Sequence, residues 1–313
     1  MLKEAQDHAV QPDVIVQSAA VFTDCAECTS IGIIDFRMSL VDAPRKPRCL
    51  IIVPAYNERT AVGKLIRRIH KHLPDFDVLL IDDGSTDDTA RQASEHTKVV
   101  SLPFNLGIGG AMQTGYRYAD FHGYDIAIQV DGDGQHRPSE VARLVEKLTD
   151  TDCDLVIGSR FMSDIKYRQS FTRMTGIQIL SALIKWLKGP STTDCTSGFR
   201  AANRRVIRAF AHWYPDDYPE PEVVLLLHKA GYKVGEVPVR MRQRRSGMTS
   251  IPLTRGLFYV IKVTVCLLLD TVREPWPQGK VGDHASSVPQ PAADPVRWDA
   301  PAPDHQKTQP VQT

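Results

Sequence analysis

Short apolar runs alternate with longer segments of mixed polarity along the middle of the chain. Five runs of four or five residues, most of them rich in branched side chains, are typical of buried strands: 49–53, 78–81, 98–102, 126–130 and 154–157. Because these runs are largely continuous rather than alternating, both faces of the predicted sheet are covered. The pattern predicts an α/β fold with a doubly wound, mostly parallel sheet.

The segments between these strands carry apolar residues at helical spacing. After the first strand the apolar positions are Ala61, Val62, Leu65, Ile66, Ile69 and Leu73. This spacing predicts an amphipathic helix, and similar patterns predict helices over 111–119 and 138–148. Ser85 and Asp88 have the spacing of a capping box for a short helix after the second strand.

A glycine-rich turn, 107–110, follows the third strand. Met112 stands where a dinucleotide-binding loop would place its third glycine, and the chain has no Gly-Lys-Ser/Thr phosphate loop. A dehydrogenase is therefore disfavoured. We interpret the glycines as a helix N-terminus that packs closely on the sheet.

Composition excludes some classes of function. The 313 residues carry a net charge of +1, which gives no support for a nucleic-acid binder. The six cysteines are scattered, and Cys25-x-x-Cys28 lacks the second pair or the histidines of a zinc site, so we assign it no role. Free thiols suit a reducing cytoplasm. The first residues do not form a signal peptide, and no stretch reaches the ~18 apolar residues of a spanning helix.

The pattern divides the chain into four parts. We expect a flexible leader over 1–47, a folded domain over 48–252, an apolar helix over 253–273 and a disordered, proline-rich tail over 274–313. The apolar helix is too short to cross a bilayer. It lies either at a membrane interface, which we favour, or buried against the domain.

Acidic side chains follow three of the predicted strands. They are Glu58 after the first strand, Asp82 and Asp83 after the second, and Asp131 and Asp133 after the fourth. Because parallel strands end at the same edge of a sheet, we expect these carboxylates to converge. Carboxylates at such an edge can bind ribose hydroxyls and base N–H groups and can hold a metal on a diphosphate.

Asp131 and Asp133 stand one residue apart, and Gly132 and Gly134 let the chain turn sharply there. Two close carboxylates repel each other unless a positive charge lies between them, and a hard cation such as Mg²⁺ or Mn²⁺ is the natural occupant. The stretch lacks two of the oxygen ligands of an EF-hand, which excludes a calcium loop. A solvated surface turn is the interpretation that this stretch alone leaves open.

Several motifs occur together in a fixed order. They are Val53-Pro-Ala-Tyr-Asn-Glu58, Asp82-Asp-Gly-Ser-Thr-Asp-Asp-Thr89, Asn105-x-Gly107-x-Gly109, Asp131-Gly-Asp-Gly-Gln135, Gly158-Ser-Arg-Phe161, Asp194-Cys-Thr-Ser-Gly-Phe-Arg200 and Glu236-Val-Pro-Val239. From about Leu50 to Ile251 the chain thereby resembles family 2 glycosyltransferases of the GT-A fold. It is most similar to the dolichyl- and polyprenyl-phosphate mannosyl- or glucosyltransferases of that family.

The resemblance implies roles for the matching positions. The residues implied in substrate binding are Pro54, Tyr56, Glu58, Asp82, Asp83, Asp131, Gly132 and Arg173. The residues implied in metal binding are Asp131, Asp133 and Gln135, which would also hold the diphosphate through the metal. The residues implied in catalysis are Asp133, Arg160, Glu222 and Arg244.

Three of these roles need separate comment. Arg160 would face an acceptor phosphate, with Arg173 as a second candidate. Arg244 would close over the donor phosphates, although the family's usual Lys is missing at Ser250. Glu222 would orient the acceptor or act as a general base. The alternative interpretation is that Glu222 only stabilises the N-terminus of a helix through the helix dipole.

The resemblance implies metal-dependent, inverting transfer of a sugar from a GDP- or UDP-linked donor to a dolichyl or undecaprenyl phosphate. The expected place is the cytoplasmic face of a membrane, with a small membrane protein as an optional partner. One alternative is transfer to a glycan hydroxyl in polysaccharide assembly, with Glu222 or Glu220 as the base. Another is a nucleotide-sugar binding protein without turnover.

Overall fold

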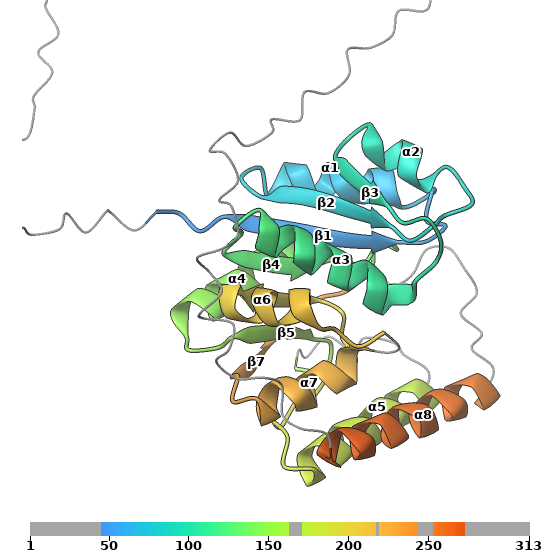
Figure 1. Cartoon of the computed structure of the whole chain (residues 1–313), viewed down its shortest axis with the longest axis vertical. Coiled ribbons are helices and arrows are strands. Elements are labelled where there is room, and N and C mark those ends of the chain that lie inside the picture. Colours follow the sequence, from blue (N-terminus) through green and yellow to red (C-terminus); the bar gives the residue numbers. More distant parts are fainter. Residues whose placement is uncertain (1–44, 163–170, 217–218, 243–252, 273–313) are drawn as a thin grey trace, which may run out of the picture. The chain divides into compact units, whose positions relative to one another are not determined.

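The computed structural model describes residues 45–162, 171–216, 219–242 and 253–272. The described part contains a sheet of seven strands in the order β3-β2-β1-β4-β6-β5-β7 (Figure 1). The strands are β1 Cys49–Ala55, β2 Asp77–Asp82, β3 Lys98–Ser101, β4 Ile126–Gln129, β5 Leu155–Ser159, β6 Arg200–Asn203 and β7 Val234–Pro238. Only β6 runs antiparallel to its neighbours, so the predicted mostly parallel sheet is confirmed.

Helices cover both faces of this sheet. They are α1 Val62–His72, α2 Thr89–Ser94, α3 Gly107–Phe121, α4 Val141–Asp150, α5 Phe171–Trp186, α6 Arg204–His212, α7 Pro219–Lys229 and α8 Leu253–Val272, with a 3₁₀ turn at Pro138–Glu140. On one face α3, α6 and α7 form a core that includes Met112, Tyr116 and Phe210. On the other face α1 and α4 bury side chains such as Leu65 and Leu144.

The strand order reverses beside β1, which lies between β2 and β4. Such a switch point opens a crevice at the carboxyl ends of the strands, where α/β proteins bind ligands. The loops there are joined by backbone hydrogen bonds to β1. The Asp83 N–H donates to the Ala55 carbonyl over 2.9 Å, and the Gly132 N–H donates to the Pro54 carbonyl over 3.1 Å.

Three details differ from the sequence predictions. Strand β1 continues to Ala55, so Pro54 is a buried strand residue and does not belong to the loop. Ser85 does not cap α2, whose N-cap is Asp88 without a side-chain hydrogen bond. The Ser85 hydroxyl instead accepts the Asn57 N–H over 3.0 Å, which ties the loops after β1 and β2 together.

Glycine allows two close approaches of α3. A Cβ on Gly115 would lie 2.4 Å from the side chain of Ile52 in β1, so this glycine lets the helix pack on the sheet. A Cβ on Gly109 would lie 2.2 Å from the Pro215 carbonyl oxygen. Gly109, near the start of the helix, therefore packs against the loop before α7. The contact that we predicted between these glycines and the sheet is made instead by Gly115.

The apolar segment near the C-terminus forms α8, which packs against α5 and α7. Among the helices that the structure describes, none combines the length and the apolar character needed to cross a bilayer.

Candidate active site

Residues 131–135, here called the metal loop, follow β4 directly. Gly132 passes so close to β1 that a Cβ there would lie 2.9 Å from the Pro54 carbonyl oxygen. Gly134 has a φ of 73°, in the left-handed region that favours glycine. These two glycines fold the loop over the end of β1 and leave the side chains of Asp131 and Asp133 half-buried at the crevice.

Asp131 is held by neighbours that the sequence patterns do not point to. The Gln129 side-chain amide donates to Asp131 Oδ1 over 3.1 Å. His136 is buried, and its Nδ1 accepts the Asp131 N–H over 3.0 Å. A neutral His136 therefore carries its proton on Nε2, which lies 3.6 Å from Asp131 Oδ2. The imidazole positions Asp131 while leaving carboxylate lone pairs for a ligand.

Asp133 is held by Gln135. The Gln135 N–H donates to Asp133 Oδ1 over 3.0 Å, and the Gln135 side-chain amide donates to Oδ2. This contact uses the nitrogen of the Gln135 amide. The side-chain oxygen of Gln135 is the atom with lone pairs for a metal. Gln135 also accepts the Arg242 N–H at its backbone carbonyl over 2.8 Å, which brings the chain after β7 to the metal loop.

This donor set fits a hard divalent cation. Asp131 and Asp133 provide carboxylate oxygens at one point of the crevice, which is the ligand type that Mg²⁺ and Mn²⁺ prefer. Within the described ranges, the structure contains no cluster of three or more His, Cys, Asp or Glu side chains suited to a metal. A cation held here would therefore complete its coordination with water and substrate oxygens, as Mg²⁺ commonly does.

The predicted nucleotide side lies at the ends of β1 and β2. Tyr56 is 46 % exposed beside the crevice. Asp82 and Asp83 are both buried, and Asp82 Oδ1 accepts the Ser85 N–H over 3.3 Å. The half-buried Glu58 donates its backbone N–H to the Thr89 hydroxyl over 2.8 Å.

Asp83 has a structural partner that its sequence position does not show. Its two carboxylate oxygens accept the N–H groups of Leu106 and Gly107 over 2.7 and 3.0 Å, so it holds the first turn of α3. Burial raises the pKa of Asp83, and these hydrogen bonds oppose that change. Contact of Asp83 with a nucleotide stays a prediction.

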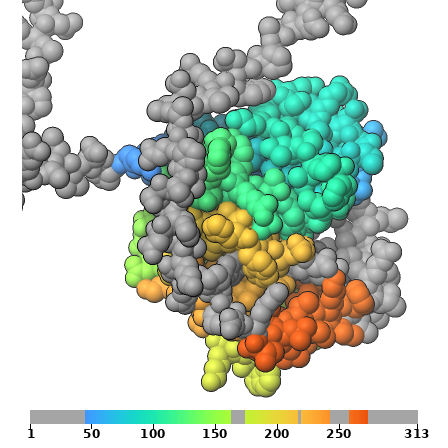
Figure 2. Space-filling model, viewed as in Figure 1, coloured from blue at the N-terminus to red at the C-terminus, as the bar shows by residue number. Residues whose placement is uncertain are grey.

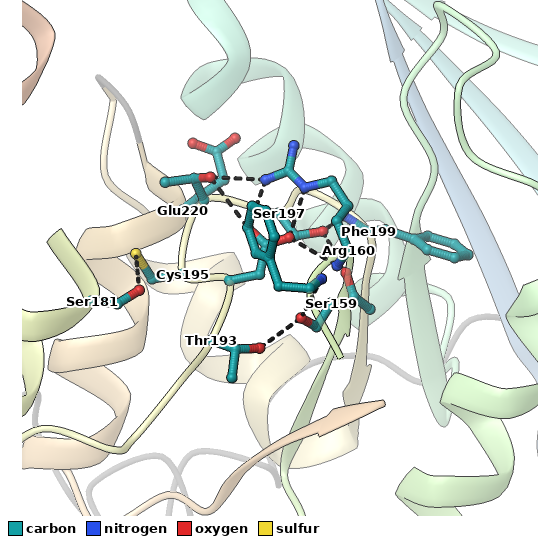
Figure 3. Close-up of polar contacts among 12 residues, drawn as sticks. Ser159, Arg160, Ser181, Thr193, Cys195, Ser197, Phe199 and Glu220 are labelled. Carbon is teal, nitrogen blue, oxygen red and sulfur yellow. Dashed lines mark hydrogen bonds and ion pairs between the residues drawn. The ribbon is translucent and has the colours of Figure 1, made fainter. Parts of the chain in front are cut away.

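Arg160 is bound inside the protein (Figure 3). Its Nε and Nη2 donate to Asp194 Oδ2 and Oδ1, each over 2.6 Å, and Nη2 also donates to the Thr196 hydroxyl over 2.9 Å. Asp194 is completely buried and Arg160 is 8 % exposed. We predict from sequence that Arg160 faces an acceptor phosphate, but the structure gives its guanidinium an internal carboxylate. The acceptor contact stays a prediction.

The late Glu-Val-Pro-Val motif explains how Asp194 is placed. Glu236, in β7, accepts the N–H groups of Thr193 and Asp194 over 2.8 and 3.0 Å. The Thr193 hydroxyl in turn contacts Ser159 over 2.6 Å. Three motifs that are far apart in sequence thus form one hydrogen-bonded network beside the crevice.

Two acids open α7. Glu222, predicted to orient the acceptor or to act as a general base, is half-buried in the first turn. The pKa of Glu220 is raised by burial, lowered by the charge of Arg200 and raised by the charge of Asp131, so Glu220 interacts electrostatically with the metal loop.

Two predicted residues cannot be placed. Arg244 lies outside the described residues, as does Ser250. Arg173 falls within α5, but its side chain is not described.

Comparison with known proteins identifies the class. Residues 50–210 match the model of Glycosyl transferase family 2, so the chain belongs to that family. The predicted glycosyltransferase class is thereby confirmed.

Curated relatives include a polyprenol monophosphomannose synthase of Mycolicibacterium smegmatis, 29 % identical over 65 % of this chain and 81 % of the relative. An undecaprenyl-phosphate mannosyltransferase of Micrococcus luteus is 30 % identical over 64 % of this chain and 86 % of the relative. A UDP-N-acetylglucosamine–dolichyl-phosphate N-acetylglucosaminyltransferase of Methanococcus voltae is 28 % identical over 67 % of this chain and 92 % of the relative.

Solved structures confirm the GT-A type of fold. Glucosyl-3-phosphoglycerate synthase of Mycobacterium tuberculosis, in complex with Mn²⁺, UDP-glucose and phosphoglyceric acid, superposes with a TM-score of 0.58. The match covers 73 % of this chain and 81 % of that one, at 22 % identity.

Proposed function

We propose that this protein transfers a sugar from a GDP- or UDP-linked donor to a polyprenyl phosphate. The observation that carries the proposal is the pair Asp131 and Asp133, held at the switch point of the sheet in a member of this family. The names of the relatives from Mycolicibacterium, Micrococcus and Methanococcus support a polyprenol or dolichol phosphate as acceptor.

The metal loop would hold Mg²⁺ or Mn²⁺ through Asp131 and Asp133. When bound, the cation neutralises charge that develops on the leaving nucleoside diphosphate. Gln129, His136 and Gln135 keep the two carboxylates in place before the donor arrives. A phosphate acceptor is already anionic, so inverting attack on the sugar needs no strong base.

We place the protein at the cytoplasmic face of a membrane, and the surface of α5 and α8 supports the contact with the membrane. These two helices pack together, and α8 is orange at the molecular surface in Figure 2. Trp186 of α5 is 73 % exposed and Val272 of α8 is 82 % exposed. Among the side chains that the structure describes in these two helices, the other exposed large apolar ones are Met174, Ile179, Phe258, Ile261, Val265, Leu268 and Leu269. We propose that this apolar face rests on lipid, where a polyprenyl phosphate would be found.

One observation favours a second candidate, transfer to a glycan hydroxyl. Such an acceptor must lose a proton, and Glu220, whose pKa is raised by burial and by the charge of Asp131, is the candidate general base. In this case, Glu220→Gln removes the activity, whereas transfer to a phosphate tolerates it.

The experiment is a transfer assay with purified protein, Mn²⁺ or Mg²⁺, labelled nucleotide-sugars and undecaprenyl phosphate in detergent. Label should enter the lipid phase with the wild type and with Asp150→Asn, a matched exposed acid on α4. It should not enter with Asp133→Asn. Transfer to a glycan but not to lipid would replace the proposal by the second candidate. Nucleotide binding without turnover on either acceptor would indicate a non-catalytic binding protein.

Membrane docking is tested separately by flotation with anionic liposomes. Phe258→Ser combined with Leu269→Ser should reduce the bound fraction, because both side chains are 63 % exposed on α8. Phe121→Ser is the control, since Phe121 is equally prominent on α3, at 61 % exposed. Equal flotation of all three proteins would refute docking through this face.

A further inference from the structure

Arg200, the first residue of β6, is the last residue of the Asp-Cys-Thr-Ser-Gly-Phe-Arg motif. It is 1 % exposed and lies opposite Gln129 in the pairing of β6 with β4. Gln129 is the residue that holds Asp131. Arg200 thus lies in the sheet directly behind the metal loop.

The guanidinium of Arg200 joins two separate segments of backbone. Nε donates to the Ser197 carbonyl over 2.7 Å, and Nη2 donates to the Cys195 carbonyl over 2.9 Å. The same Nη2 donates to the carbonyl of Glu220, at the start of α7, over 2.7 Å. Cys195, Ser197 and Glu220 gather in the close-up of Figure 3. One side chain therefore links the 194–200 loop to the first turn of α7.

The charge of Arg200 has no ion-pair partner among the described residues. Its buried Nη1 also has no hydrogen-bond partner in the same part of the chain. A buried cation without a paired carboxylate costs folding free energy. The three hydrogen bonds to backbone carbonyls offset part of this cost and depend on the position of the guanidinium.

The 194–200 loop also contacts the metal loop. The Phe199 ring stacks on the His136 ring with centroids 4.7 Å apart, and His136 binds the Asp131 backbone. A Cβ on Gly198 would lie 3.1 Å from Asp131 Oδ2, so the loop runs against that carboxylate. A shift of α7 relative to the loop would change the distance between its acids and the metal loop.

We infer that Arg200 is a positioning residue that fixes the first turn of α7, with Glu220, against the metal loop. The three carbonyls require a donor that is planar and forked, which arginine provides and lysine does not. The inference rests on the proposed function only where it is tested by the kinetics of sugar transfer. The second measurement, hydrogen exchange of the amides in α7, does not depend on any activity.

The test compares Arg200→Lys and Arg200→Met with Arg204→Lys. Arg204 is the matched control, because it also donates to backbone carbonyls. It donates to the Tyr124 carbonyl over 2.9 Å and to the Asp120 carbonyl over 3.3 Å, at the C-terminal end of α3 and not at α7. Hydrogen exchange of the amides of 223–227 and steady-state kinetics of sugar transfer are measured for each variant. Arg200→Lys retains the charge and decides the question should Arg200→Met fail to fold.

In Arg200→Lys, exchange in α7 should accelerate by about tenfold or more, the equivalent of one lost hydrogen bond. The kcat should fall about 10- to 100-fold with the donor KM nearly unchanged, because Arg200 also holds the 194–200 loop, which runs against Asp131. Arg204→Lys should show neither effect. Unchanged exchange in Arg200→Lys, or equal acceleration in Arg204→Lys, would overturn the inference. A wild type without turnover would remove the proposed function but would leave the exchange result to decide the positioning role.

Discussion

Replacing Asp194 by Asn tests the buried ion pair beside the crevice. Asp194 receives three hydrogen bonds from Arg160: from the backbone N–H over 3.1 Å, and from Nε and Nη2 over 2.6 Å each. Asparagine has one side-chain oxygen and would turn an NH₂ group toward the guanidinium. The variant therefore keeps the volume of the side chain but removes the buried carboxylate that accepts from this guanidinium.

The size of the effect follows from burial. Because the two side chains are 7 % and 0 % exposed, solvent does not screen the loss. Breaking one partner of a buried pair costs about 3–5 kcal/mol of unfolding free energy. For a domain of this size, that lowers the melting temperature by about 6–20 °C.

The assay is urea unfolding followed by circular dichroism, in a double-mutant cycle of Asp194→Asn with Arg160→Met. The double variant should recover part of the loss, because it removes the buried guanidinium together with its carboxylate. Asp152→Asn is the control: its ion pair with Lys233 is largely exposed, with side chains 90 % and 66 % accessible, and should contribute less than about 1 kcal/mol. A loss below about 1 kcal/mol in Asp194→Asn, or strict additivity in the cycle, would refute the reasoning.

Three further perturbations have directions fixed by the structure. His136→Phe keeps the ring stacking but loses the nitrogen that binds the metal loop, so Mn²⁺ affinity measured by calorimetry should fall about 10- to 100-fold; unchanged affinity would contradict this. Gly109→Ala would place its Cβ 2.2 Å from a backbone carbonyl oxygen and should lower the free energy of unfolding in urea by about 1–3 kcal/mol. Gly63→Ala is the control: it lies in α1 with its nearest neighbour at 3.6 Å, and it should raise the free energy of unfolding by about 0.5–1 kcal/mol. Burial raises the pKa of the Cys49 and Cys195 thiols from 9.0 to about 11, so their contribution to stability is complete below pH 9.0 and is lost as the pH rises through about 11; Cys195→Ala should flatten this alkaline decline, and an unchanged slope would count against it.

The sheet was predictable where the strands are buried on both faces. Strands β1 to β5 are apolar runs, and each was located to within a few residues. Strands β6 and β7 were missed because Arg200–Asn203 and Val234–Pro238 are short and partly polar. Their strand conformation comes from pairing with β5, and such long-range pairing leaves little trace in the local sequence pattern.

The candidate site was predictable to a similar extent. The convergence of Asp83 and Asp131 follows from parallel strands that end at one edge. The residues that hold them were not predictable, since Gln129 lies within a strand and His136 resembles any polar loop residue. For Arg160 the motif indicated a contact with substrate. Only the fold shows that its guanidinium donates to the Asp194 carboxylate.

The sequence by itself determined the fold class, and it predicted the edge at which the candidate site lies and the acidic residues at its centre. These features follow from periodicity and from motif order, which are local properties of the chain. Only the tertiary structure decided the antiparallel insertion of β6, the link from Glu236 through Asp194 to Arg160, and the position of Arg200 behind the metal loop. Each of these depends on hydrogen bonds between residues distant in sequence, and their geometry exists only once the sheet has formed.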